Sequence, residues 1–232
     1  MNCGVHAKRG KEAMDSFGIL PRFLGTLVHD CFAPYFSYAC RHALCGAHLL
    51  RELVFLRDVR RCAWAEGMRR LLLRMKGAVA EAREAGLEAV PEEALEVFYA
   101  EYCAVLEEGY GTDPGPPRRP GRPRAKGRRG RTAQSLEKNL LDRLSGRAEA
   151  VLAFLHDFSV PFDNNQSERD VRMTKVKQKI SGGFRTEEGA KRFCRVRGYV
   201  STMRKQGVCP LEALESVFAG RTMYPAGLGK GC

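Results

Sequence analysis

The stretch TLVHDCFAPYFSYACRHALCGAHLL, residues 26–50, decides the fold of this chain. It begins with a brief apolar run, Asp30 follows closely, and Pro34 soon blocks any regular element. We therefore predict a short buried strand that carries a carboxylate at its end. Residues 41–45 predict a second short strand, and Gly46 leads into a helix. The leucines of that helix share one face, namely Leu49, Leu53 and Leu56.

Three helical segments follow in succession. Apolar residues recur at helical spacing from Met68 to Val79, and a second segment opens at Pro91 and is followed by Gly109. The third predicts one helix over residues 134–156. Its stripe consists of Leu136, Leu140, Leu144, Val151 and Leu155. Between the second and third segments, residues 113–131 are rich in Pro, Gly and Arg, which predicts a mobile basic loop.

Short helices are predicted at both ends of the chain. Residues 11–17 favour one, and the pair Asn164 and Asn165 marks the start of another, because an Asn side chain can accept from the amides of a first helical turn. Glu168 lies in that first turn. Beyond a glycine loop, residues 187–205 predict a helix and Pro210 begins the last one. The inward residues of the longer helix are Phe193, Val196, Val200 and Met203.

The charge balance points to a polyanionic partner. The 232 residues hold 39 Lys and Arg against 27 Asp and Glu, which gives a formal charge of +12. Such an excess favours nucleic acid first, because neutralised phosphates release counterions, and an anionic membrane surface second. No run of about 18 apolar residues and no signal peptide appears, so we expect a cytoplasmic protein. Nine scattered cysteines are interpreted as reduced thiols.

Asp30 and Glu168 are the candidate metal ligands. Mg²⁺ prefers hard oxygen ligands and keeps several waters, so a phosphoryl-transfer site needs only a few converging carboxylates. A strand end and a helix start are suitable places for them. The alternative interpretation is that Asp30 is an ordinary cap or turn residue.

The helix that carries Glu168 adds phosphate-binding cations. Arg172, Lys175 and Lys179 follow Glu168 at spacings of four, three and four, so they share its face, while Val176 and Ile180 can turn inward with Val171. The alternative is a solvated charged face with an ion pair between Glu168 and Arg172.

A second constellation contains soft metal ligands. Cys40, His42, Cys45 and His48 are residue types that bind zinc, and Cys45 and His48 have a usable spacing. The alternative is a core cysteine at Cys45 and a histidine at His48 that packs or forms hydrogen bonds near the site.

The basic loop is a candidate for contact with DNA that does not depend on the DNA sequence. Its charge density keeps it extended until it meets phosphates. The cations are Arg118, Arg119, Arg122, Arg124, Lys126, Arg128, Arg129 and Arg131. The alternative is a solvated linker.

Several motifs together resemble one family. Residues 4–15, 28–30, 42–53, 164–173 and 177–186 resemble, in that order, the DDE-type transposases of the insertion-sequence sixty-six family. The resemblance implies an α/β, ribonuclease-H-like fold with a mostly helical insertion. It matches Asp30 to the second aspartate of the family and Glu168 to its glutamate. It also implies Mg²⁺ or Mn²⁺ as cofactor and DNA as partner.

The implied organisation has four parts. Residues 1–61 would be a partial core with the second aspartate and residues 62–157 the helical insertion with its basic loop. Residues 158–219 would return to the core with the glutamate, and residues 220–232 form a tail.

The family's first aspartate has no match in this sequence. Asp15 is no substitute, because it lies on a predicted helix downstream of the strand that bears that aspartate. We therefore expect a carboxyl-terminal fragment of a transposase that does not cut DNA alone. The alternative is an inactive remnant that binds DNA, a full-length transposase or a second copy of itself. A zinc-stabilised RNA-binding protein is a weaker alternative, without an aromatic RNA-recognition motif.

Overall fold

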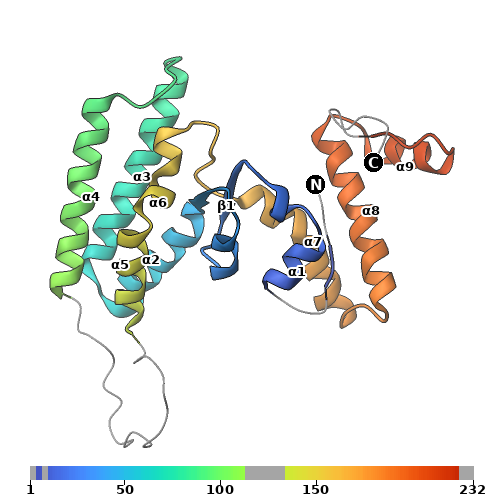
Figure 1. Cartoon of the computed structure of the whole chain (residues 1–232), viewed down its shortest axis with the longest axis horizontal. Coiled ribbons are helices and arrows are strands. Elements are labelled where there is room, and N and C mark those ends of the chain that lie inside the picture. Colours follow the sequence, from blue (N-terminus) through green and yellow to red (C-terminus); the bar gives the residue numbers. More distant parts are fainter. Residues whose placement is uncertain (1–3, 7–9, 113–133, 225–232) are drawn as a thin grey trace, which may run out of the picture. The chain divides into compact units, whose positions relative to one another are not determined.

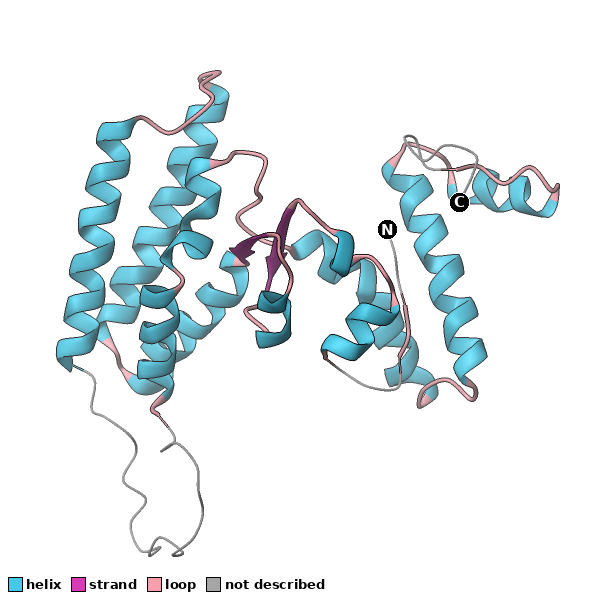
Figure 2. Ribbon diagram, viewed as in Figure 1, coloured by secondary structure: helices cyan, strands magenta, loops and turns pink. Residues whose placement is uncertain are grey.

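The structure is a computed structural model that describes residues 4–6, 10–112 and 134–224. The chain divides into two compact units, which are drawn in Figures 1 and 2. The central unit comprises residues 23–164, and the terminal unit comprises Met1–Arg22 with Asn165–Cys232. Each is described by itself.

The central unit contains a small parallel sheet. Strand β1 (Thr26–His29) pairs with β2 (Arg41–Leu44), in a register that runs from Thr26 opposite Arg41 to His29 opposite Leu44. The connection between them includes the 3₁₀ helix η2 (Ala33–Ser37). Both predicted strands are confirmed, and Asp30 directly follows β1.

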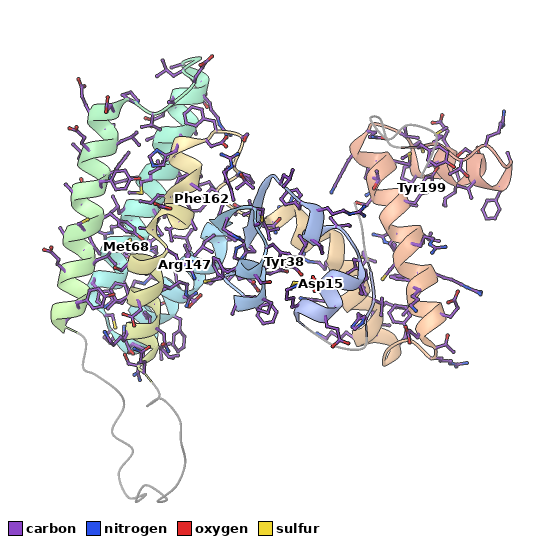
Figure 3. The ribbon with its side chains drawn as sticks, in the orientation of Figure 1. Asp15, Tyr38, Met68, Arg147, Phe162 and Tyr199 are labelled. Carbon is purple, nitrogen blue, oxygen red and sulfur yellow. The ribbon has the colours of Figure 1, made fainter. Side chains whose placement is uncertain are left out.

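Helices form the rest of the central unit. They are α2 (Gly46–Arg60), α3 (Ala63–Glu84), α4 (Glu92–Thr112), α5 (Leu136–Gly146) and α6 (Ala148–His156). Helix α3 packs between α2 and α4, and α6 lies against β2 (Figure 1). Met68 on α3, labelled in Figure 3, is fully buried in the core together with Leu53 and Leu141. The helical periodicity read from the sequence thus marks the true core face of α2 and α3.

Two helix predictions in this unit are wrong, one at its end and one in its middle. Helix α4 continues through Gly109, because the absent side chain lets it approach α5 closely: a Cβ there would come within 2.5 Å of Leu141. The predicted single helix over residues 134–156 is two helices, broken at Arg147, whose φ of −130° is not helical. Leu136, the first residue of α5, does not belong to the buried stripe and is 57% exposed.

The terminal unit is helical in its described part. It contains α1 (Lys11–Ser16), η1 (Leu20–Arg22), α7 (Asn165–Ser181), α8 (Glu187–Lys205) and α9 (Pro210–Phe218). Helix α8 packs against both α7 and α9. The Tyr199 hydroxyl, labelled in Figure 3, donates to the Ala213 carbonyl oxygen over 3.3 Å and joins α8 to α9.

Helix ends in this unit follow local rules, whereas some inward faces do not. Thr186 caps α8 by accepting from the Gly189 amide, and Gly182 ends the preceding turn with a φ of 67°. Val196 and Ile180 were predicted to point inward. Both predictions are wrong, since Val196 is 51% exposed and Ile180 is 78% exposed. Helical spacing alone could not choose the buried face of such charged helices.

The described residues therefore form a mostly helical α/β protein with one two-stranded parallel sheet. This agrees with the predicted fold class at that level. The ribonuclease-H-like fold and the four-part organisation stay predictions.

Candidate active site

Asp30 is held in a tight turn at the carboxyl end of β1. The Phe32 amide donates to its Oδ1 over 3.2 Å, and Cys31 between them has a φ of 67°, a left-handed conformation that is uncommon for a residue with a side chain. Asp30 itself is exposed. The turn thus fixes the backbone and leaves a carboxylate in contact with solvent, where a cation can reach it.

Two histidines, which the sequence interpretation used little, support this turn from inside. His29 is 3% exposed, and its Nδ1 accepts the Cys31 amide over 3.1 Å. Its Nε2 lies 3.2 Å from His42 Nδ1, and His42 Nε2 lies 3.2 Å from the Tyr38 carbonyl oxygen. One assignment of protons satisfies all three contacts: both Nε2 atoms donate and both Nδ1 atoms accept.

That assignment requires neutral rings, and the electrostatics agree. Burial is the largest cause that lowers the pKa of His29 to about 4, and the neighbouring His42 lowers it further. Asp30 acts in the opposite direction, and Arg147 contributes a small lowering. His29 is therefore uncharged at neutral pH and serves as a structural hydrogen-bonding group. Its only signal in the sequence is a histidine at the end of a buried strand.

Aromatic rings enclose the histidine pair. Phe36 lies 4.8 Å from His29 and 5.0 Å from His42, measured between ring centroids. Arg147, labelled in Figure 3, lies at the break between α5 and α6. Its guanidinium is 4.1 Å from the centre of the Phe36 ring, a contact that supports η2. These contacts help to bury His29, which lies behind the turn that holds Asp30.

A hollow of about 840 Å³ lies beside β2 and the start of α6. Arg41, Arg147 and Glu149 line it, and Arg41 forms an ion pair with Asp157 over 3.2 Å. Asp30 is not among the described residues that line it. Because its lining contains charges of both signs, we assign no ligand to it.

The segment before α7 is fastened to the carboxyl ends of both strands. The Asn164 side-chain amide donates to the Val28 carbonyl oxygen over 3.1 Å, and its backbone amide donates to Cys45 Sγ over 3.2 Å. The Gly46 amide donates to the Phe162 carbonyl oxygen over 2.8 Å. Asn164, which the sequence suggested as a helix start, thus contacts the strand that ends at Asp30.

Glu168 is the fourth residue of α7, inside its first turn, as the sequence predicts. Arg172, Lys175 and Lys179 all lie exposed along the same helix. Asp30 belongs to the central unit and Glu168 to the terminal unit. The convergence of the two carboxylates therefore stays a prediction.

The zinc interpretation gains no support in the described part of the chain. No three His, Cys, Asp or Glu side chains converge there in an arrangement that could hold a metal ion. His42 uses both ring nitrogens in hydrogen bonds, and Cys45 accepts from Asn164. The cations of the basic loop, from Arg118 to Arg131, lie outside the described residues.

Comparisons with known proteins identify one relationship. A family model described as Transposase IS66 family matches residues 3–192. Neither the curated proteins nor the solved structures that were compared give a match. Among the described helices, none combines the length and apolar character needed to cross a bilayer.

Proposed function

Because the chain belongs to the Transposase IS66 family, we propose that it acts in DNA transposition, through metal-dependent cleavage and transfer of DNA strands. Transposition is the activity for which the family is described, and DDE-type members use divalent metal ions in general. The observation that supports the finer proposal is the placement of Asp30, exposed in a rigid turn at the end of β1. Glu168, in the first turn of α7, is the second carboxylate.

The proposed site would hold Mg²⁺ or Mn²⁺ between Asp30 and Glu168. Bound metal ions activate the attacking oxygen and stabilise the leaving oxygen of a phosphodiester. The chain's own contribution is to fix its ligands: the Phe32 amide holds one oxygen of Asp30, and the neutral His29 holds the Cys31 amide. A rigid ligand loses less entropy when it binds the ion.

Exposed cations on α7 would hold the DNA beside that site. Arg172, Lys175 and Lys179 follow Glu168 at spacings that keep them on one side of the helix. Such contacts go to phosphates and do not read sequence. The basic loop between Arg118 and Arg131 would add sequence-independent affinity. We further propose that the small sheet belongs to a ribonuclease-H-like core.

Metal binding tests the site directly. Electron paramagnetic resonance of Mn²⁺ with the purified chain should detect a bound ion that is lost in Asp30→Asn and in Glu168→Gln. Asp15→Asn is the matched control, because Asp15 forms its own ion pair with Lys11 over 2.6 Å on α1. Equal Mn²⁺ affinity in the wild type and both carboxylate variants would contradict a shared site.

A strand-transfer and nuclease assay with Mg²⁺ or Mn²⁺ complements it. The family pattern includes a third carboxylate that no residue of this sequence matches, so we expect no cleavage by the chain alone. An Asp30→Ala variant is the control. Cleavage that disappears in this variant would mean that another residue supplies the third ligand.

A further inference from the structure

We propose that a cluster of arginines at the junction of α2 and α3 binds the phosphates of a DNA backbone. The proposal rests on the proposed function in one respect, namely that DNA is the partner, and does not depend on the metal site. Residues 57–70 hold five arginines and two acidic residues, all in the central unit. The five arginines, called the junction cluster below, are Arg57, Arg60, Arg61, Arg69 and Arg70.

A single carboxylate gathers three of these arginines. Glu66, in the first turn of α3, accepts from Arg69 Nε and Nη2 over 2.7 Å and 2.8 Å. It also accepts from Arg70 Nε over 2.7 Å and from Arg57 Nη1 over 3.1 Å. The hydrogen bonds from Arg69 and Arg70 hold the pKa of Glu66 well below its usual range, so its carboxylate is ionised at neutral pH. Three guanidinium groups therefore share one negative charge.

The junction cluster stays positive after its ion pairs are counted. Besides Glu66, its acidic partners are Asp58, which pairs with Arg57 over 2.7 Å, and Glu137. Glu137 on α5 pairs with Arg60 over 2.6 Å. Five arginines thus face three carboxylates, which leaves two positive charges. Exposed ion pairs add little stability to a fold, so stabilisation of the helices does not account for three arginines on one carboxylate.

Two of the arginines are oriented by their partners and still have donors to offer. Arg70 bonds Glu66 through Nε, and Arg60 bonds Glu137 through Nε. Within the described part of the chain, neither forms another hydrogen bond, so the N–H groups on Nη1 and Nη2 remain available. The Arg70 side chain is 72% exposed and that of Arg60 is 41% exposed. A guanidinium fixed in this way presents a planar fork that suits two oxygens of a phosphate.

The cluster lies at the end of the central unit to which residues 113–133 are connected. Arg60, the last residue of α2, bonds Glu137 in the first turn of α5. A Cβ at Gly109, near the end of α4, would come within 3.2 Å of Trp64 on α3. The end of α4 and the start of α5 therefore lie beside the junction of α2 and α3 (Figure 1). The basic loop joins the unit next to the cluster, so one DNA molecule can contact both.

Salt-dependent DNA binding by a double variant, Arg61→Gln with Arg70→Gln, tests the cluster. We expect the slope of log affinity for duplex DNA against log salt to fall by about 2, because each lost phosphate contact releases about one counterion fewer. Both side chains are exposed, and Glu66 keeps its bonds to Arg57 and Arg69. Circular dichroism should therefore show the fold of the wild type.

The matched control is the double variant Arg74→Gln with Arg83→Gln. It removes the same charge from two exposed positions farther along α3, where Arg74 is paired with Glu101 over 2.6 Å. We expect it to keep the slope of the wild type. An equal loss of slope in both double variants would mean that net charge alone matters, and would overturn the proposal.

A measurement on the wild type does not depend on the folding of any variant. Arginine modification by phenylglyoxal, followed by mass spectrometry, should become slower at Arg61 and Arg70 when duplex DNA is bound. Arg74 and Arg83 should react as fast as in the free protein. Modification of Arg61 and Arg70 that DNA does not slow would overturn the proposal, and so would a wild-type slope in the folded double variant.

The outcomes also separate this proposal from the proposed function. Loss of the cluster alone leaves the metal site untouched, because Mn²⁺ binding is measured without DNA. A wild-type chain that does not bind DNA at low salt would overturn both. Vesicles of phosphatidylcholine and phosphatidylglycerol are the second probe. If the Arg61→Gln, Arg70→Gln variant loses affinity for these vesicles and keeps its affinity for DNA, the cluster binds a membrane surface and the assignment to DNA is wrong.

Discussion

The carboxyl end of β1 and the helix α7 carry the two proposed ligands, yet they differ in how they are held. Behind Asp30 lies a chain of hydrogen bonds between polar groups. It runs from the Cys31 amide through His29 and His42 to the Tyr38 carbonyl oxygen. Helix α7 presents charged residues and exposed apolar ones such as Ile180. A buried polar network fixes geometry, whereas an exposed cationic helix supplies affinity that depends on salt. The turn at Asp30 is therefore fixed by internal hydrogen bonds, whereas α7 presents an exposed charged surface.

The largest expected effect is the loss of stability when the buried histidine network is titrated with acid. The pKa of His29 is about 4 in the folded protein and 6.5 ordinarily. Between pH 6.5 and pH 4, His29 therefore binds a proton in the unfolded chain but stays neutral in the folded protein. The free energy of unfolding should therefore fall by about 3 kcal/mol as the pH drops from 6.5 to 4. Urea unfolding with a metal chelator, compared between the wild type and His29→Phe, measures it. A pH dependence that is the same in both would assign the loss to other groups.

A substitution at Gly46 tests how closely the Phe162 ring packs against this residue. In Gly46→Ala the new methyl group overlaps the ring, so we expect destabilisation by about 1–3 kcal/mol. Gly77→Ala is the matched control, because nothing lies within 4 Å of a Cβ at that position on α3. Urea midpoints report both variants. A Gly46→Ala protein as stable as the wild type would mean that the ring moves aside freely.

The cationic helix should respond to salt and hardly to pH. A Lys175→Ala, Lys179→Ala double variant should reduce the slope of log affinity for duplex DNA against log salt by about 2, since each lysine releases about one counterion. Fluorescence anisotropy at several salt concentrations measures it. Lys191→Ala is the control, because that lysine is paired with Glu187 over 2.7 Å on α8. An unchanged slope would exclude Lys175 and Lys179 from the DNA contact.

The smallest effect belongs to the exposed apolar surface. Ile180→Ser should change the free energy of unfolding by less than about 0.5 kcal/mol, because its side chain already contacts water. Leu53→Ala in the buried core should cost about 2–5 kcal/mol. Urea unfolding of the two variants checks this order. A large loss of unfolding free energy in Ile180→Ser would show that the Ile180 side chain is buried against another part of the protein.

The sequence predicts what depends on neighbours along the chain. Apolar spacing predicts the buried faces of α2 and α3, and Asn164 marks the start of α7. The two short strands are predicted from apolar stretches that end before Pro34 and Gly46. It fails where a distant residue decides. Helix α4 passes through Gly109 because Leu141 packs there, and the acceptor of Asn164 is 136 residues away. The His29 and His42 contacts, likewise, depend on the pairing of two strands.

The hydrogen bond between the Asn164 amide and Cys45 Sγ makes the thiol a natural reporter. Cys45 is 1% exposed, so a thiol reagent reaches it only when this part of the protein opens. Cys103 and Cys209 are exposed and would be modified at once. The slow phase of alkylation at Cys45, followed by mass spectrometry, would thus time the opening of the segment that precedes α7 without any introduced label.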